Sequence, residues 1–140
     1  MVTTDTFKRG FYKGITTFFE LSKILVPVYL GVQLLSVSGI LSIMADFFTP
    51  AMSVFGLPGE TSLVLILGYF SGGYAALGAM AVIKLTSIQI TTVSIMVTIA
   101  HSLITEGAVV KKLGVSTMAS VLLRILFSLI AGFLFNLIFG

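Results

Sequence analysis

Long apolar stretches alternate with short polar breaks along most of the chain. After an amphipathic start, four apolar blocks follow one another, at residues 24–45, 61–83, 87–106 and 115–139. Each block is close to the length of about 20 residues that an α-helix needs to cross the hydrocarbon core of a bilayer. The segment between the first two blocks is rich in proline and glycine and is expected to be a loop. The pattern therefore predicts an all-α membrane protein.

Residues 1–23 have a different pattern, in which charged and aromatic side chains are interleaved. Apolar side chains recur there at helical spacing, at positions 7, 11, 15 and 18, and the charges lie mostly elsewhere. Such a helix presents one face to the acyl chains and the other to the headgroups, so it lies along the membrane surface. We therefore expect an N-terminal amphipathic interfacial helix over residues 1–23, followed by a single transmembrane domain over residues 24–140.

The second apolar block contains four glycines within the eleven residues 68–78. Each glycine weakens a helix by about 1 kcal/mol relative to alanine, and Ser71-Gly72-Gly73 lies near the middle of the block. Half of the block is about ten residues, or roughly 15 Å of helix, which reaches only half-way through a core of about 30 Å. We therefore expect a re-entrant helical hairpin over residues 61–83 and three transmembrane helices elsewhere. The alternative is four full spans, in which the glycines allow close helix packing.

The distribution of basic residues favours the hairpin. With the N-terminus in the cytoplasm, a re-entrant second block keeps Lys111 and Lys112 inside and leaves only Lys84 outside. Four full spans would place Lys111 and Lys112 outside, against the tendency of basic residues to stay on the cytoplasmic side.

The third apolar block carries a narrow polar stripe. Its members recur every three or four residues and so share one helix face: Ser87, Thr91, Ser94, Thr98, His101 and Thr105. A polar face gains nothing from contact with lipid, so the stripe is expected to line a cavity or a helix interface. Glu106 ends the block and Gly107 follows, where we expect the helix to loosen. The candidates for contact with a solute are Ser94, Thr98, His101 and Glu106; the alternative is that the hydroxyls bond to carbonyls one turn back.

Two further charged residues are candidates for the site, although each also has a structural explanation. Arg124 lies ten residues into the last block, where a charge is costly unless it is paired. We expect it to pair with an acid such as Glu106; the alternative is that its side chain extends to the nearer membrane surface. Glu60 follows Pro58-Gly59 at the start of the second block, where the positive end of a helix suits a carboxylate.

The composition excludes several classes of function. The 140 residues are 57% hydrophobic and 9% charged, with a mean hydropathy of +1.16, whereas a soluble domain carries about 25% charged residues. The net charge of +3 is small and the basic residues are scattered, so we expect no nucleic-acid partner. There is no cysteine and a single histidine, so we expect no metal site and no cofactor. No nucleophile–base pair stands out either, so we expect no enzyme and no catalytic residue.

Several motifs together resemble the Gate, or nucleoside-recognition, domain family. They are Gly56-Leu57-Pro58-Gly59-Glu60, then Gly68-Tyr69-Phe70-Ser71-Gly72-Gly73-Tyr74, then His101, Glu106-Gly107 and Leu113-Gly114, with Arg124 in the last helix. The resemblance covers residues 20–140 and extends to small bacterial members such as the spore maturation proteins A and B. It implies the order span, re-entrant hairpin, span and span, as in one repeat of the concentrative nucleoside transporters. It also implies substrate contacts at the hairpin tip and the following helix, which here are Ser71, Gly72, Gly73, Thr98, His101 and Glu106.

These expectations combine into one functional hypothesis. A unit with three crossings and one hairpin corresponds to half of an inverted-repeat transporter, which needs a second unit to complete a site at the membrane midplane. We expect a half-size, multi-pass permease subunit in the cell inner membrane that pairs with an inverted copy of itself or with a second Gate-domain protein. It would carry a polar small solute, nucleoside-like or ion-coupled, by alternating access. The alternative is a non-transporting membrane assembly protein, for example in a sporulation-type process, whose polar stripe is a protein interface.

Overall fold

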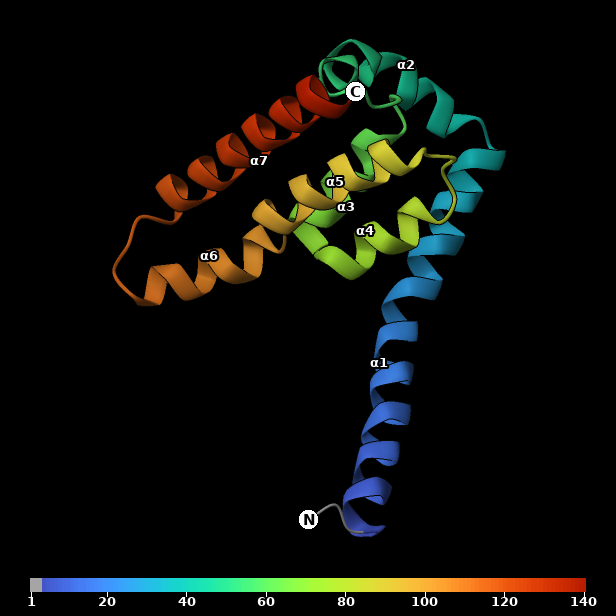
Figure 1. Ribbon diagram of the computed structural model, residues 1–140, viewed down its shortest axis with the longest axis vertical. Helices are drawn as coiled ribbons and strands as arrows, with labels where there is room; N and C mark the ends of the chain where they lie inside the picture. The colour runs from blue at the N-terminus through green and yellow to red at the C-terminus, as the bar shows by residue number, and fades with distance from the viewer. Residues whose placement is uncertain (1–3) are drawn as a thin grey trace.

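The computed structural model describes residues 4–140, which form helices joined by short connections (Figure 1). The α-helices are α1 (Thr4–Val37), α2 (Ile40–Met52), α3 (Thr61–Ser71), α4 (Gly73–Met80), α5 (Ser87–Ala100), α6 (Leu103–Lys112) and α7 (Thr117–Phe139). A short 3₁₀ helix, η1 (Ser53–Phe55), follows α2. No β-strand occurs within residues 4–140. The prediction of an all-α protein is therefore confirmed for this part of the chain.

Three helical segments of the described chain are long and apolar enough to cross a membrane: Thr4–Val37, Ser87–Lys112 and Thr117–Phe139. The second of these comprises α5 and α6. In contrast, α3 has 11 residues and α4 has 8, or about 16 Å and 12 Å of helix, which is too short for the hydrocarbon core. The number of membrane-length helices thus agrees with the three expected spans, while the path of α3 and α4 through a bilayer stays a prediction.

The first helix is continuous across the predicted boundary between an interfacial helix at residues 1–23 and a span at residues 24–45. Where each part lies relative to a bilayer stays a prediction. Residues 1–3 of that prediction lie outside the described residues. From Thr4 the helix continues without interruption through Pro27 to Val37. No glycine or proline stands at the predicted boundary, so nothing in the local sequence ends the helix there. Residues 4–20 are all exposed, and this part of α1 extends away from the other helices (Figure 1).

The chain breaks after α1 at Ser38–Gly39 instead. Gly39 has a φ of 78°, a left-handed conformation that glycine adopts without steric cost. As a result α2 begins inside the predicted first span and continues into the predicted loop, where it includes Pro50 near its end. Gly59 then packs against α2, since a Cβ at this position would lie 2.1 Å from the carbonyl oxygen of Ala45. The glycine therefore allows the loop before α3 to approach α2 closely.

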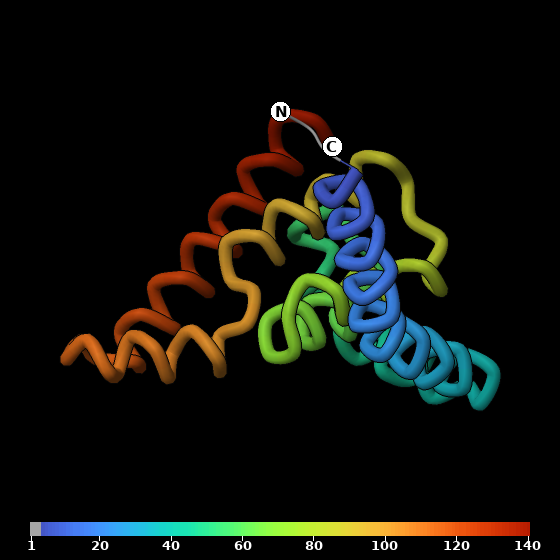
Figure 2. The backbone as a smooth tube through the Cα atoms, turned by 90° about the horizontal axis from the view of Figure 1, so that it is seen from below, coloured from blue at the N-terminus to red at the C-terminus, as the bar shows by residue number. Residues whose placement is uncertain are grey.

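The core lies where α3, α4, α5 and α7 meet. The helices α5 and α7 lie side by side and run in opposite directions (Figure 1), and a turn of the view shows α4 beside the second half of α1 (Figure 2). The fully buried apolar residues are Val64, Ala79, Val93, Met96 and Ala100. Gly132 of α7 faces Met96, because a Cβ there would lie 2.5 Å from the methionine sulfur. This glycine is therefore a site of close helix contact.

A buried hydrogen-bond chain joins three of these helices. Ser128 of α7 donates its hydroxyl proton to the carbonyl oxygen of Met96 in α5, at 2.8 Å. The hydroxyl oxygens of Tyr69 in α3 and Ser128 are 2.6 Å apart. Because a hydroxyl has one proton to donate and Ser128 uses it on Met96, Tyr69 is the donor to Ser128. These two hydrogen bonds thus fix α3, α5 and α7 relative to one another.

Tyr69→Phe should therefore lower the free energy of unfolding by about 0.5–1.5 kcal/mol, the usual net value of one hydrogen bond. Ser128 keeps its bond to Met96 in the variant, so the loss is limited to one bond. Unfolding in detergent micelles, followed by circular dichroism, measures the effect. The control is Tyr74→Phe, because Tyr74 is 50% exposed. Equal losses in the two variants would contradict the role assigned to the buried bond.

Candidate functional site

The helices α3 and α4 form a helical hairpin whose tip is Gly72 (Figure 1). The backbone N–H of Gly72 donates to the carbonyls of Leu67 and Gly68, at 3.1 Å each, and its own carbonyl accepts from Ala75 N–H at 3.1 Å. One residue therefore ends α3 and begins α4. Its backbone angles, φ 108° and ψ 173°, lie in a region that is essentially restricted to glycine. The hairpin tip thus depends on glycine at this position.

A second irregular segment interrupts the long helical span between Ser87 and Lys112. The helix α5 ends at Ala100, His101 is extended with φ −70° and ψ 154°, and Ser102 is left-handed with φ 52° and ψ 38°. Ser102 is the one residue other than glycine in the described chain that has a positive φ. Such a conformation costs about 1–3 kcal/mol and persists only where the surroundings fix it.

The position of this break corrects the expectation of an uninterrupted span over residues 87–106 that loosens at Glu106-Gly107. Glu106 lies in the first turn of α6. Gly107 is buried within the same helix, and a Cβ there would lie 2.9 Å from the methyl carbon of Thr117. The missing side chain of Gly107 therefore serves contact between α6 and the start of α7, and it does not end a helix.

The hairpin tip and the helix break touch each other. The backbone N–H of Ser102 donates to the carbonyl of Gly68 at 3.3 Å. A Cβ on Gly72 would lie 2.7 Å from the Ser102 hydroxyl oxygen. The hairpin therefore fixes the unusual backbone of Ser102, and two irregular segments meet at one place. At membrane depth, irregular backbone is tolerated only where it is buried in protein or lines a water-filled cavity.

A cavity of about 380 Å³ lies at this meeting point. The structure brings six of the candidate residues to its wall: Ser71, Gly72, Gly73, Ser94, Thr98 and His101. The first three come from the hairpin tip, and the others come from the polar stripe of α5 and its end. No side chain of Asp, Glu, Lys or Arg is part of this wall. The cavity is thus lined by hydroxyls, backbone groups and one imidazole.

The remaining wall residues were not found from the sequence. They are Tyr74, Ala76, Leu77 and Met80 of α4, Val97 of α5, and Ser102 at the helix break. Most are apolar residues of apolar helices, which no periodicity distinguishes from residues that face lipid. Ser102 carries a usable signal, because it forms a consecutive polar pair with His101 inside an apolar block.

The polar stripe reaches the cavity only in part. Ser94, Thr98 and His101 are at the wall, whereas Ser87, Thr91 and Thr105 are not. Two of the hydroxyls also donate to carbonyls one turn back. Thr91 donates to the Ser87 carbonyl at 2.8 Å, and Thr98 donates to the Ser94 carbonyl at 2.7 Å. Both interpretations of the stripe therefore apply to Thr98, and the structural one alone applies to Thr91.

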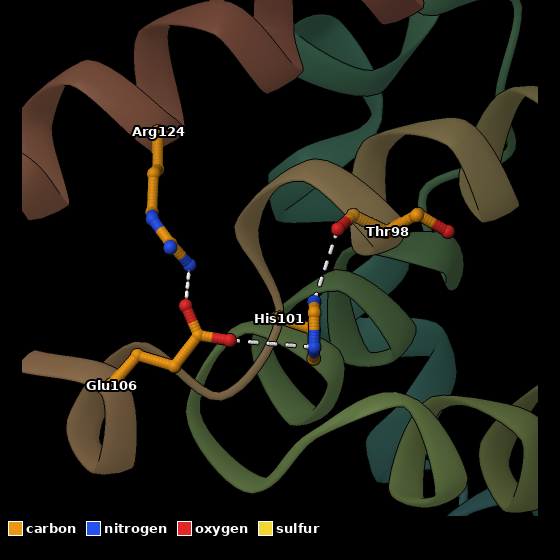
Figure 3. A network of polar contacts seen from close by, with 4 residues as sticks. All are labelled: Thr98, His101, Glu106 and Arg124. Atoms are coloured by element: carbon orange, nitrogen blue, oxygen red, sulfur yellow. Dashed lines mark hydrogen bonds and ion pairs between the residues drawn. The ribbon is translucent and has the colours of Figure 1, made fainter. Parts of the chain in front are cut away.

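Glu106 and Arg124 form a charged pair (Figure 3). One carboxylate oxygen of Glu106 pairs with the guanidinium of Arg124 on α7, as expected from the sequence. The other oxygen lies 3.4 Å from Nε2 of His101. Nδ1 of the same imidazole lies 3.0 Å from the carbonyl oxygen of Thr98. Glu106 is therefore linked to the cavity through His101 and is not part of its wall.

Glu60 lies apart from these residues. It precedes the first residue of α3, at the opposite end of that helix from the hairpin tip, and its side chain makes no capping bond there. It borders a different hollow of about 350 Å³, which it shares with Ser36 and Lys84. The structure therefore does not bring Glu60 to the cavity. Within residues 4–140, no group of three or more His, Cys, Asp or Glu side chains is gathered closely enough to hold a metal ion.

Comparison with known proteins gives two matches. The sequence profile of the Gate family, described as nucleoside recognition, matches residues 18–138. Over 132 residues, or 94% of this chain, the sequence is 30% identical to the uncharacterized membrane protein YvoD of Bacillus subtilis (strain 168). The chain spans 42% of the length of that relative. No solved structure matches the chain significantly.

Proposed function

Because the chain belongs to the nucleoside-recognition (Gate) family of membrane proteins, we propose that it is a half-size permease subunit for a polar small solute. It is a multi-pass protein of the cell inner membrane and works by alternating access. Its partner is an inverted copy of itself or a second Gate-domain protein. The role is transport, with no enzymatic step, no cofactor and no nucleic-acid partner.

The observation that carries this proposal is the cavity between the hairpin tip at Gly72 and the helix break at His101–Ser102. In transporters, binding sites are typically formed where discontinuous helices expose backbone groups and helix ends near the membrane midplane. Gly72 and Ser102 give this chain two such discontinuities in contact with each other. A purely structural helix interface has no need of either one, since continuous helices pack well.

The lengths of α3 and α4 support a re-entrant hairpin. Neither helix reaches across a hydrocarbon core of about 30 Å, and both meet at one tip. A hairpin that enters and leaves by the same face leaves three crossings in the chain. An odd number of crossings places the two termini on opposite faces, and a second unit in inverted orientation then completes a symmetric site.

The wall of the cavity indicates the chemistry of the solute. Hydroxyls of Ser71, Ser94 and Thr98 and the imidazole of His101 offer hydrogen bonds, while Leu77 and Val97 offer apolar contact. No Asp, Glu, Lys or Arg side chain of the wall balances a full charge on a ligand, and a buried unpaired charge is costly. An uncharged molecule with several hydroxyl or amide groups and a flat apolar part, such as a nucleoside, fits this wall.

Uptake by proteoliposomes tests the proposal. Purified protein is reconstituted into liposomes, alone and together with a second Gate-domain protein of the same cell. The liposomes are loaded with radiolabelled uridine or adenosine. Saturable exchange of either nucleoside above the rate of empty liposomes is the expected result. If neither preparation moves these nucleosides or a panel of other uncharged polar metabolites, the protein is not a permease of the proposed kind. Cavity variants that abolish complex formation would instead indicate the assembly role.

Thr98→Val should weaken solute binding by about 2-fold to 13-fold, the effect of losing one hydrogen bond of about 0.5–1.5 kcal/mol. The matched control is Thr91→Val on the same helix. Both threonines donate to the carbonyl four residues back, so the two variants lose the same local bond, but only Thr98 lines the cavity. Apparent affinity in the uptake assay is the measurement. An equal change in both variants would remove Thr98 from the binding site.

A further inference from the structure

The imidazole of His101 lies between two hydrogen-bond acceptors (Figure 3). Nδ1 is 3.0 Å from the backbone carbonyl oxygen of Thr98. Nε2 is 3.4 Å from a carboxylate oxygen of Glu106, whose other oxygen pairs with Arg124. The guanidinium of Arg124 carries only donors, so it holds Glu106 in the carboxylate form that accepts on both oxygens.

The number of protons that the His101 ring needs follows from its two contacts, with the Thr98 carbonyl and the Glu106 carboxylate. A carbonyl oxygen only accepts, so the contact with Thr98 requires a proton on Nδ1. A neutral imidazole has no second proton, and its Nε2 then points a lone pair at the lone pairs of Glu106. Because Arg124 holds Glu106 as a carboxylate, the contact between His101 and Glu106 becomes a hydrogen bond only when Nε2 carries one more proton. The pair as a unit is therefore built to hold one additional proton.

The surrounding groups leave this proton without a competing charge. Arg124 from α7 and Glu106 from α6 balance each other. The hairpin contributes Ser71, the backbone of Gly72 and Gly73, and Tyr74 to the shared cavity, and none of these is charged at neutral pH. The side chain of His101 is 45% exposed and lines the cavity wall, so a proton can reach it from the solute pathway.

We propose that His101 and Glu106 form a proton-binding site, and that the proton is the ion coupled to solute movement. The coupling role rests on the proposed function, whereas the proton-binding site does not. A hydronium ion in the cavity gives its proton to the pair and leaves as water, and the same proton is later released to water on the other side. No other bond forms or breaks.

The position of the pair explains how the proton affects the protein. His101 belongs to the break between α5 and α6, and Glu106 belongs to the first turn of α6. With the proton bound, one continuous set of contacts runs from Thr98 through His101 and Glu106 to Arg124. Without it, two lone pairs face each other across the break, and the contact opens. The proton therefore biases the helix break that Ser102 shares with the hairpin tip.

Nitrogen NMR of the histidine ring tests the site directly, because His101 is the only histidine in the chain. The full chain, purified with an affinity tag that contains no histidine, is labelled with ¹⁵N-histidine and placed in lipid nanodiscs. Spectra are recorded between about pH 5 and pH 9, where imidazoles change their protonation. In the wild type the one-proton form of the ring should carry its proton on Nδ1. A one-proton form that carries it on Nε2 overturns the proposal, and this reading needs no variant.

Glu106→Gln provides the second reading. The glutamine amide can donate a hydrogen bond to Nε2 of His101, which the carboxylate cannot do. In the variant, the contact between residues 101 and 106 is therefore a hydrogen bond without the additional proton. At equal pH, the ratio of the two-proton to the one-proton ring should be lower in this variant than in the wild type, because the carboxylate beside Nε2 is gone. Glu60→Gln, far from His101, should match the wild type. Equal ratios in Glu106→Gln and the wild type overturn the proposal.

Uptake separates this inference from the proposed function. An inward proton gradient should drive accumulation of uridine by wild-type proteoliposomes, and Glu106→Gln should keep exchange but lose the gradient-driven accumulation. Solute uptake that no proton gradient changes would overturn the coupling role and leave the permease in place. The expected ring spectra together with no uptake of any solute would support the proton-binding site and overturn the permease.

Discussion

Gly72→Ala should destabilise the protein by about 3 kcal/mol or more and abolish solute uptake. Backbone angles in the region that Gly72 occupies, φ 108° and ψ 173°, cost a residue with a Cβ at the upper end of about 1–3 kcal/mol. The added Cβ would also lie 2.7 Å from the Ser102 hydroxyl oxygen, so the helix break would have to move. Because the hairpin tip and the break share this contact, the variant changes the cavity as well as the stability.

The neighbouring glycine is the matched control for this prediction. Gly73 begins α4, and a Cβ there would meet no atom within 4 Å. Its φ is not positive in the structure, so Gly73→Ala should be neutral or stabilise the hairpin by up to about 1 kcal/mol, through better helix propensity. Chemical unfolding in micelles and nucleoside uptake are compared for both variants. Similar losses in stability would show that the two glycines do not differ in the way the backbone indicates.

The two discontinuities differ in how well local sequence predicts them. The break at Gly72 is visible in advance because adjacent glycines weaken any helix. The break at His101–Ser102 is not, since neither residue ends a helix by its own propensity and the nearest glycine, Gly107, lies inside α6. This break is fixed by a long-range bond from Ser102 N–H to the Gly68 carbonyl. Periodicity within one block carries no information about that bond.

Helix boundaries are likewise predictable only where a local sequence signal sets them. The start of α7 at Thr117 agrees within two residues with the apolar pattern, because Ser116 caps the helix with its side chain. The continuity of α1 from Thr4 to Val37 crosses a change from amphipathic to apolar composition. That change of composition does not end the helix, because both stretches are compatible with a helical backbone. Composition therefore does not predict the bounds of α1.

The candidate site was predictable on its polar side only. A Ser, Thr and His stripe must avoid lipid, and its helical spacing predicts the face that carries Ser94, Thr98 and His101. The spacing does not tell which members of the stripe line the cavity, because Ser87, Thr91 and Thr105 share that face and are not at the wall. The apolar wall, including Leu77 and Met80 of α4, depends on which face of a short, uniformly apolar helix the hairpin turns inward. The packing of α4 on α1 sets this orientation. Gly78 of α4 lies so close to α1 that a Cβ on it would be 3.2 Å from the Leu25 carbonyl oxygen and 3.3 Å from the Val28 side chain.

Arg124→Gln should lower the free energy of unfolding by about 2 kcal/mol, within the range for a hydrogen bond to a charged group. The variant leaves the Glu106 carboxylate without its cationic partner in a segment long and apolar enough to span a membrane, where an unpaired charge is costly. Lys112→Gln is the control for the loss of one positive charge, because Lys112 is exposed at the end of α6. A loss of similar size in this control would mean that net charge, and not the pair, is responsible.

A double-mutant cycle isolates the pair itself. Arg124→Gln and Glu106→Gln each leave one charge unpaired, but the double variant leaves none, and its two amides can bond to each other. The double variant should therefore be less destabilised than the sum of the single variants, by a coupling energy of about 0.5–3 kcal/mol. Additive losses would show that Arg124 and Glu106 do not interact in the membrane. In that case Arg124 would not hold Glu106 as a carboxylate toward His101, and the two halves of the charged network would have to be explained separately.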